Sequence, residues 1–184
     1  MKKLFLVALM AVFTSSAFAQ LITSNRTIHN KTHNVWVDFG IGTYTGDSND
    51  TGLGLDLGFR YTKMFTENIG WDIFKISAQT DTKHFKGSLN LQAKTGIRGV
   101  TPVLFGESTA YVNFAAGYGH YIDLKGDGGG FVWEIGAGLN ITPRFAVGIV
   151  YNRADQSYEV KGYREKVKVE PKIGLLSLRV AYAL

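Results

Sequence analysis

The sequence contains no cysteine and only three prolines in 184 residues. Without cysteine the chain can form neither a disulfide framework nor a Cys-ligated metal site, so two common stabilising devices of small exported domains are excluded. The chain also lacks an uninterrupted apolar run of the ~20 residues that a membrane-spanning helix requires. Its length predicts a single domain, and its 45% hydrophobic content excludes disorder for most of the chain.

The charge balance shows only a small excess of one sign. Twenty Lys and Arg residues face 15 Asp and Glu residues, a formal net charge of +5. Two of these bases, Lys2 and Lys3, belong to a predicted leader, and their removal leaves 18 bases against 15 acids, or +3. Such a small excess does not indicate nucleic-acid binding, so we expect no nucleic-acid partner.

Residues 1–19 have the composition of a signal peptide. Two lysines precede the apolar run Leu4 to Phe13, and the segment ends in Ala17-Phe18-Ala19, the small-x-small pattern that signal peptidase accepts. A membrane helix is the alternative, but ten apolar residues are too few to cross a ~30 Å hydrocarbon layer. We therefore predict cleavage before Gln20, followed by a polar segment over residues 20–34.

From Val35 to the end, alternating segments are separated by turn-rich stretches, which predicts a β domain over residues 35–184. We predict eight strands, at approximately 35–45, 52–62, 69–78, 88–98, 109–122, 131–141, 145–153 and 172–184. Most of them match the roughly 9 to 11 residues that a tilted strand needs to cross a bilayer, whereas soluble strands usually have about 5 to 6. Strand length therefore favours a membrane barrel.

Strict alternation sorts seven of these strands into two faces; the third strand is left aside because its phase slips. One face is apolar except at Thr43 and Thr95. The other face carries ten glycines: Gly40, Gly42, Gly54, Gly58, Gly96, Gly117, Gly119, Gly136, Gly138 and Gly148.

Two all-β folds fit this alternation: a soluble barrel with the apolar face inward, or a membrane barrel with it outward. A glycine-rich face would make a poor solvent surface, because glycine weakens a strand and offers nothing to pack. Inside a narrow eight-stranded barrel, small residues leave room for long ones. The sequence therefore predicts an all-β, eight-stranded antiparallel up-and-down transmembrane β-barrel.

Eight charged residues are predicted to point into this barrel, Asp72 among them if its strand keeps the inward phase. They are Asp38, Asp56, Arg60, Asp72, Lys94, Arg98, Glu134 and Arg179. Buried charge must be paired, so we expect a lumen plugged by paired charges. In particular, we expect Glu134 to bond at least one of the four bases.

Aromatic residues lie near the predicted strand ends, where Tyr and Trp prefer the membrane–water interface. Tyr61, Trp71, Phe145 and Tyr182 gather toward one rim, and Tyr118, Phe131, Trp133 and Tyr151 toward the other. We predict that these eight residues form two interfacial girdles.

The segment from Val35 to Leu184 resembles the small eight-stranded outer-membrane barrels of the OmpA and OmpX type, in the porin-like group. The most specific element is the final stretch Leu176 to Leu184, which looks like the terminal strand read by the family's assembly machinery. The family usually ends in Phe or Trp, whereas this chain ends in Leu184 with Tyr182 two residues earlier.

The resemblance implies a location in the outer membrane of a Gram-negative bacterium, with both mature termini in the periplasm. The implied partners are outer-membrane lipid and lipopolysaccharide, and the barrel-assembly machinery through the C-terminal strand. Our leading functional hypothesis is a non-enzymatic role in envelope structure, surface recognition or adhesion. A narrow porin-like channel for small solutes is the alternative, because the inward glycines could leave gaps along the barrel axis.

Three local motifs imitate ligand sites without completing one, so we predict no metal and no cofactor. His29 and His33 are spaced by four residues but lack a third ligand. Residues 47–52 resemble the start of a calcium loop, yet Gly58 stands where a bidentate Glu is required. Residues 127–130 are glycine-rich, but no Lys-Ser/Thr pair or helix follows, as a phosphate-binding loop would need.

One combination of residues suits catalysis: Asp81, His84 and Ser88 lie near one predicted loop, where an acid, a base and a nucleophile can meet. Barrels that modify lipid A place such groups near the outer rim, but neither the deacylase nor the palmitoyl transferase motif is present. We therefore predict no enzymatic activity, and a lipid A-modifying enzyme remains a third hypothesis.

Overall fold

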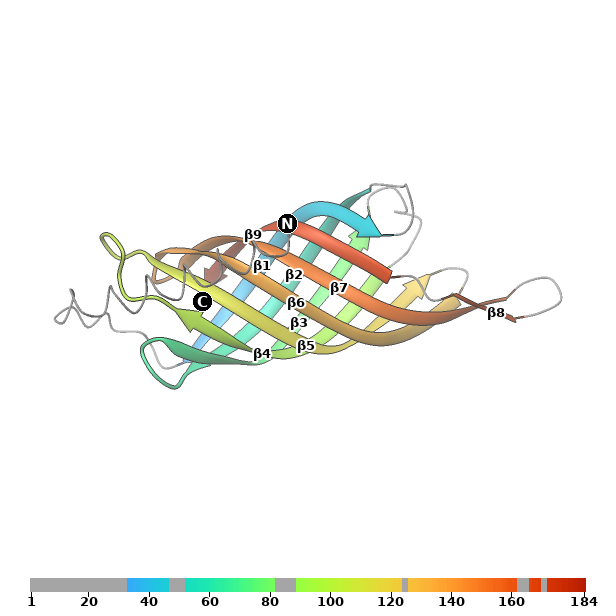
Figure 1. Cartoon of the computed structure of the whole chain (residues 1–184), viewed down its shortest axis with the longest axis horizontal. Helices are drawn as coiled ribbons and strands as arrows, with labels where there is room; N and C mark the ends of the chain where they lie inside the picture. The colour runs from blue at the N-terminus through green and yellow to red at the C-terminus, as the bar shows by residue number, and fades with distance from the viewer. Residues whose placement is uncertain (1–32, 47–51, 82–88, 124–125, 162–165, 170–171) are drawn as a thin grey trace, which may run out of the picture.

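The computed structural model describes residues 33–46, 52–81, 89–123, 126–161, 166–169 and 172–184. The described residues form nine strands and no helix long and apolar enough to cross a membrane (Figure 1). The strands are β1 (His33–Gly46), β2 (Leu53–Met64), β3 (Ile69–Asp81), β4 (Leu89–Val100), β5 (Thr109–Asp123), β6 (Gly126–Thr142), β7 (Phe145–Lys161), β8 (Lys166–Val169) and β9 (Lys172–Ala183).

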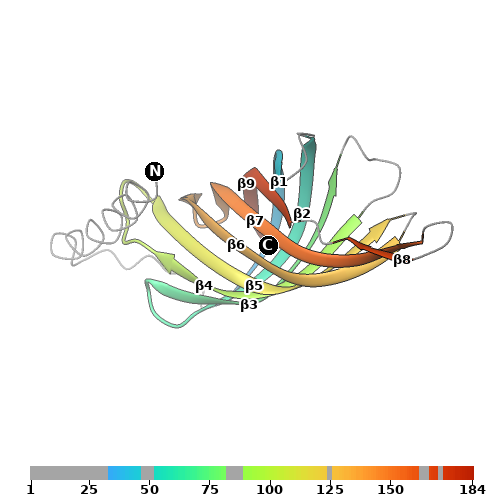
Figure 2. The same cartoon turned by 45° about the vertical axis from the view of Figure 1, so that its right-hand side comes forward.

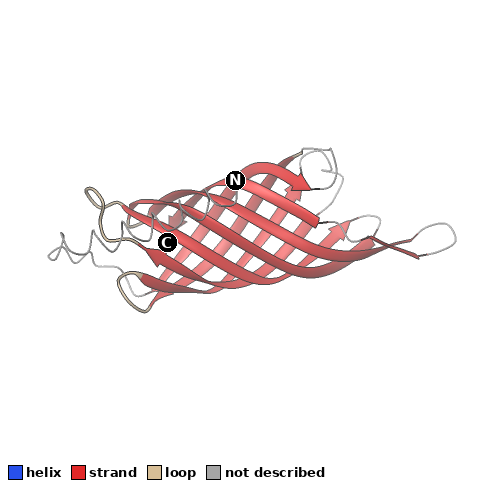
Figure 3. Ribbon diagram, in the orientation of Figure 1, coloured by secondary structure: helices blue, strands red, loops and turns tan. Residues whose placement is uncertain are grey.

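Eight of the nine strands close into a barrel. Each strand from β1 to β7 pairs antiparallel with the next, β7 pairs with β9, and β9 pairs back with β1. The strands tilt strongly against the long axis of the molecule (Figures 2 and 3). The predicted eight-stranded antiparallel barrel is confirmed, and β8 pairs with β7 alone, outside the barrel wall.

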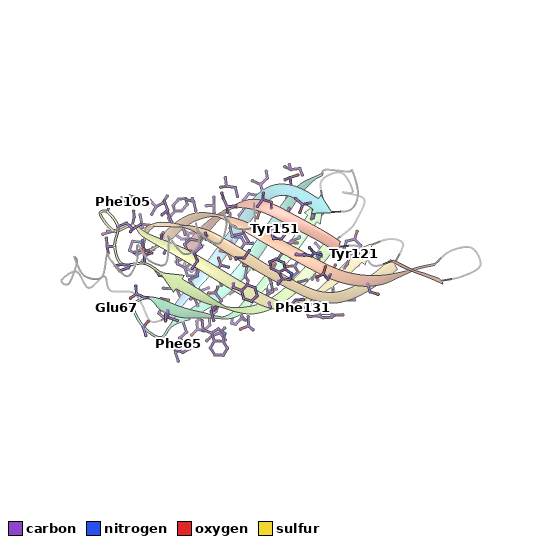
Figure 4. All side chains as sticks on the ribbon, in the orientation of Figure 1. Phe65, Glu67, Phe105, Tyr121, Phe131 and Tyr151 are labelled. Carbon is purple, nitrogen blue, oxygen red and sulfur yellow. The ribbon has the colours of Figure 1, made fainter. Side chains whose placement is uncertain are left out.

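The two faces of the wall carry apolar side chains outside and charged side chains inside, the reverse of a soluble barrel. Leu57 and Ile149 are 58% and 60% exposed on the outside, whereas Asp56 and Arg60 are 2% exposed inside. Large apolar side chains cover the outer surface in Figure 4. The apolar face therefore points outward and the polar face lines the lumen.

The two ends of the barrel differ, and we call them the turn end and the loop end. The connections 65–68, 101–108 and 143–144 lie at the turn end, which Phe65, Glu67 and Phe105 mark in Figure 4. At the loop end β5, β6 and β7 run on past their neighbours, and β8 lies beyond them (Figure 1).

Two regions whose sequence predicts loops are mostly strand. Residues 123–130 and 154–171 were expected to be loops, yet β6 begins at Gly126 and β7 continues to Lys161. Glycine and polar residues suggested turns there. In the structure these residues pair across the β5–β6, β6–β7 and β7–β8 ladders, which satisfy the backbone groups without requiring an apolar face.

The phase slip in the third predicted strand is a β-bulge. On β3 the register with β2 passes from Phe74 to Asp72, so Ile73 is an extra residue. The register with β4 jumps at the same place, and Thr95 alone stands opposite Ile73 and Phe74. Both Asp72 and Lys75 consequently point into the lumen, where they are 1% exposed.

Inward glycines mark places where neighbouring strands approach too closely for a side chain. A Cβ added at Gly42 would lie 2.5 Å from the Cα of Ser177 on β9, and one at Gly96 would lie 2.5 Å from the Cβ of Ala115 on β5. Their location inside the narrow barrel agrees with the packing argument from the sequence.

Candidate functional site: the charged lumen

The centre of the lumen is organised around Glu134 on β6, which is fully buried. Its carboxylate accepts hydrogen bonds from Lys75 Nζ at 2.5 Å, Lys94 Nζ at 2.8 Å and Arg179 Nη1 at 3.2 Å. The amide of Asn113 donates a fourth bond, at 3.2 Å. Three bases from β3, β4 and β9 therefore converge on one carboxylate.

Arg179 extends this centre to a second acid. Its Nη2 donates to Oδ2 of Asp56 at 2.5 Å, while its Nη1 contacts Glu134. Lys75 likewise reaches Asp38, with 3.7 Å between Nζ and Oδ2. Both bases bridge two carboxylates, so the ion pairs form a connected network.

A second group of charges lies nearer the turn end. Arg60 contacts Asp38 at 3.3 Å and Asp72 at 3.8 Å, and Arg98 Nε lies 3.7 Å from Asp72. The hydroxyl of Thr62 donates to Asp72 at 2.6 Å. Asp38, shared between Arg60 and Lys75, joins this group to the Glu134 centre.

All eight charged residues predicted to face inward lie in this network, and Glu134 bonds two of its four expected partners, Lys94 and Arg179. The ninth member is Lys75, which sequence reasoning missed because the third strand was left unassigned. The available signal was the adjacent apolar pair Ile73 and Phe74, which breaks alternation between two charged residues. With an extra residue at Ile73, Lys75 takes the inward phase.

Toward the loop end the network continues as a neutral amide layer. Its members are Gln79, Asn90, Gln92, Asn152 and Gln156. Gln92 accepts a bond from Lys94 Nζ at 2.8 Å and one from the amide of Asn152 at 2.9 Å. Gln156 donates to Asn90 at 2.9 Å. The amide layer fills the lumen above the charges and is coupled to them through Lys94.

At the turn end the lumen is closed by an apolar plug. It consists of Trp36, Tyr111, Ala146, Ala181 and Ala183, all buried. The guanidinium of Arg60 lies 5.2 Å from the Trp36 ring centroid and that of Arg98 lies 4.3 Å from the Tyr111 centroid. These cation–π contacts join the plug to the charged network.

The eight aromatic residues predicted to form girdles lie on the outer face. Tyr61, Trp71, Phe145 and Tyr182 stand near the turn end of their strands, and Tyr118, Phe131, Trp133 and Tyr151 stand toward the loop end. The rings of Trp133 and Tyr151 meet edge to face, 5.6 Å apart. Their location at two membrane interfaces stays a prediction.

Most of the remaining sequence candidates lie outside the described residues or have side chains that are not described. His84, Ser88, His29 and residues 47–51 lie outside the described residues, and Asp81 and His33 are strand ends whose side chains are not described. Residues 127–130 belong to β6 rather than to a loop. In the described part of the chain, no three His, Asp or Glu side chains stand close enough to hold a metal ion.

Comparison with known proteins gives one family and several similar folds. A family model described as the outer membrane protein beta-barrel domain matches residues 5–182. No curated protein sequence matches the chain significantly.

Among solved structures, the Neisserial surface protein A, NspA, has a TM-score of 0.61 at 12% identity, covering 84% of this chain and 98% of its own. The outer membrane enzyme PagL has a TM-score of 0.56 at 14% identity, covering 81% and 99%. OprG from Pseudomonas aeruginosa has a TM-score of 0.50 at 13% identity, covering 85% and 98%. At these identities the likeness concerns the fold alone.

Proposed function

The chain belongs to the family of outer membrane protein beta-barrel domains, and from this premise we propose that it is a non-conducting, non-enzymatic barrel that acts through its loop end. The role is structural in the envelope, or consists of recognition or adhesion at the cell surface. In this proposal the turn end and both mature termini face the periplasm and the loop end faces outside.

The observation that carries the proposal is the filled lumen. Nine charged side chains are paired inside it and each is at most 7% exposed. The apolar plug closes the turn end, and the amide layer covers the charges at the other. A solute would have to displace charged pairs at a high desolvation cost, which supports a barrel that does not conduct.

The shape of the loop end supports a role outside the membrane. β5, β6 and β7 extend past the neighbouring strands, and β7 and β8 continue as a two-stranded hairpin beyond the wall (Figure 1). Such an extension adds nothing to the closure of the barrel and projects beyond its wall. The similar neisserial protein is named as a surface protein, which agrees with this use of the fold.

A narrow channel for small solutes is the second candidate. The observation in its favour is a set of buried lumen atoms with no hydrogen-bond partner, among them Asp56 Oδ1, Gln79 Nε2 and Gln156 Oε1. Polar atoms of this kind are normally satisfied by water, so a partly hydrated lumen fits them.

Conductance of the purified full-length protein in a planar bilayer tests the proposal. We expect no stable channel events, whereas steady conductance in the wild-type protein would replace the plugged barrel by the narrow channel. Because PagL, an enzyme, shares the fold, mass spectrometry of lipid A from expressing cells tests the non-enzymatic role. An altered acyl chain pattern would contradict it.

A further inference from the structure

The outer apolar surface ends abruptly on β7 at the loop end. From the turn end, the outward side chains along this strand are Phe145, Val147, Ile149 and Tyr151, followed by Arg153 and Asp155. The side chains of Arg153 and Asp155 are 34% and 41% exposed. Among the described outward side chains of the loop half, Arg153 is the one arginine or lysine. The change from apolar to charged surface therefore takes place within a single outward step.

Aromatic side chains surround Arg153 on the membrane side. Trp133 stands opposite Arg153 in the β6–β7 register, and its ring packs edge to face against Tyr151. On the other side Gly174 stands opposite Arg153 in the β7–β9 register. A Cβ at Gly174 would lie 2.7 Å from the hydroxyl oxygen of Tyr151. The missing side chain thus leaves room for the Tyr151 ring beside the guanidinium.

The ion pair with Asp155 orients the Arg153 guanidinium but does not use all of its hydrogen-bond donors. Its Nε donates to Oδ1 of Asp155 at 3.1 Å. The Tyr151 hydroxyl is a further partner of the guanidinium. A guanidinium has five N–H donors in a planar fork, so these contacts leave donors for an incoming acceptor. An exposed ion pair of this kind contributes little by itself, and an incoming anion can share the guanidinium without a large loss.

We propose that Arg153, flanked by Trp133 and Tyr151, binds the phosphate of an anionic lipid in the leaflet at the loop end. Aromatic rings at the end of an apolar face lie at headgroup depth, and the Arg fork matches phosphate geometry. Asp155 holds the guanidinium in place. The inference rests on the proposed orientation, in which that leaflet contains lipopolysaccharide and the phosphates are those of lipid A.

Native mass spectrometry of the detergent-purified barrel, mixed with bisphosphorylated lipid A, tests the site. We expect Arg153→Gln to weaken lipid A binding about tenfold, the loss of one charge-assisted contact to phosphate. Arg153→Lys keeps the charge but lacks the planar fork of donors, so its affinity for lipid A should lie between those of the wild type and Arg153→Gln. Arg144→Gln, an exposed arginine in the turn 143–144 at the opposite rim, is the matched control and should bind like the wild type.

Two further binding measurements show which part of the lipid is recognised. Lipid A stripped of its phosphates should bind the wild type as weakly as bisphosphorylated lipid A binds Arg153→Gln. Inorganic phosphate should not compete at the same concentration, because it lacks the acyl chains that the aromatic surface contacts. Equal binding of both lipids, unchanged binding by Arg153→Gln, or full competition by inorganic phosphate would overturn the proposal.

The orientation on which the site rests is measured separately. The chain has no cysteine, so Ser157→Cys on the loop-end part of β7 can be labelled selectively in intact cells with an impermeant maleimide. Labelling from outside supports the orientation. If the residue is labelled from outside but Arg153→Gln binds lipid as the wild type does, only the phosphate site is contradicted. If the residue is labelled only after the envelope is opened, the orientation itself is contradicted.

Discussion

Asp72 and Lys75 lie three residues apart on β3, yet both side chains point into the barrel. In a regular strand an odd separation places two side chains on opposite faces. The extra residue Ile73 cancels that difference, and the bulge supplies an additional inward base to Glu134. A backbone irregularity therefore contributes directly to the charge network.

Replacing Glu134 by Ala should strongly destabilise the barrel. The change leaves Lys75, Lys94 and Arg179 without their shared carboxylate, and breaking a buried ion pair costs about 3 to 5 kcal/mol. Urea unfolding of the lipid-reconstituted protein, followed by heat-modifiable gel mobility, measures the effect. Asp155→Asn, which removes the exposed partner of Arg153, is the control and should unfold close to wild type. Equal stability of all three proteins would mean that water, not protein, solvates the lumen charges.

Lys75 and Glu134 should be energetically coupled. Lys75→Met and Glu134→Gln each remove one charge from the Lys75–Glu134 contact, whereas the double variant removes both charges. A double-mutant cycle on unfolding free energies should give a coupling of about 1 to 3 kcal/mol, as for residues in one buried network. Additive single effects would show that the 2.5 Å contact contributes nothing specific to stability.

Thr95→Val tests whether the Thr95 hydroxyl satisfies the hydrogen-bonding groups at the bulge on the outer face. The Thr95 hydroxyl accepts from Trp71 Nε1 at 2.8 Å and donates to the backbone carbonyl of Asp72 at 3.0 Å. Valine leaves both groups unpaired in an apolar setting, so unfolding should require about 1 to 3 kcal/mol less. Thr43→Val is the matched control, because Thr43 is the other polar residue of the apolar face and bonds only weakly to the adjacent carbonyl of Tyr44, at 3.5 Å. If both variants unfold alike, the hydroxyl of Thr95 has no role at the bulge.

Much of this fold could be predicted from the sequence, because a barrel wall imposes a period of two on every strand. The alternation placed Leu57 outside and Asp56 inside, as the structure has them. The charge at Glu134 could also be assigned partners, since a buried carboxylate requires them. These predictions depend on local pattern and on desolvation, both of which can be derived from the residues.

What could not be predicted depends on contacts between strands. The inward position of Lys75 was missed because a bulge shifts the register of β3 against both neighbouring strands. The one local sign of the bulge is the adjacent apolar pair Ile73–Phe74. The strand ends were misplaced at Gly126 and Lys161, because glycine and polar residues continue a ladder whenever another strand accepts their hydrogen bonds. Pairing partners, not propensity, decide both features.

A Leu57→Arg substitution tests which face meets lipid. Leu57 lies in the middle of β2, is 58% exposed and shares its face with Phe39 on β1 and Ala78 on β3. An arginine at the midplane of a lipid-facing strand costs about 2 to 4 kcal/mol, and the cost falls toward zero near the interfaces. The free energy of unfolding in lipid vesicles should therefore drop by that amount. The matched control is Leu53→Arg, which adds the same charge on the same strand and face but at the end of the strand, where it should change stability little. A Leu57→Arg protein as stable as the wild type, or a wild type that stays folded and dissolved without detergent or lipid, would contradict the outward placement of the apolar face. The difference between the Leu57→Arg and Leu53→Arg variants separates a bilayer from a general effect of charge, because water outside a soluble barrel would treat both positions alike.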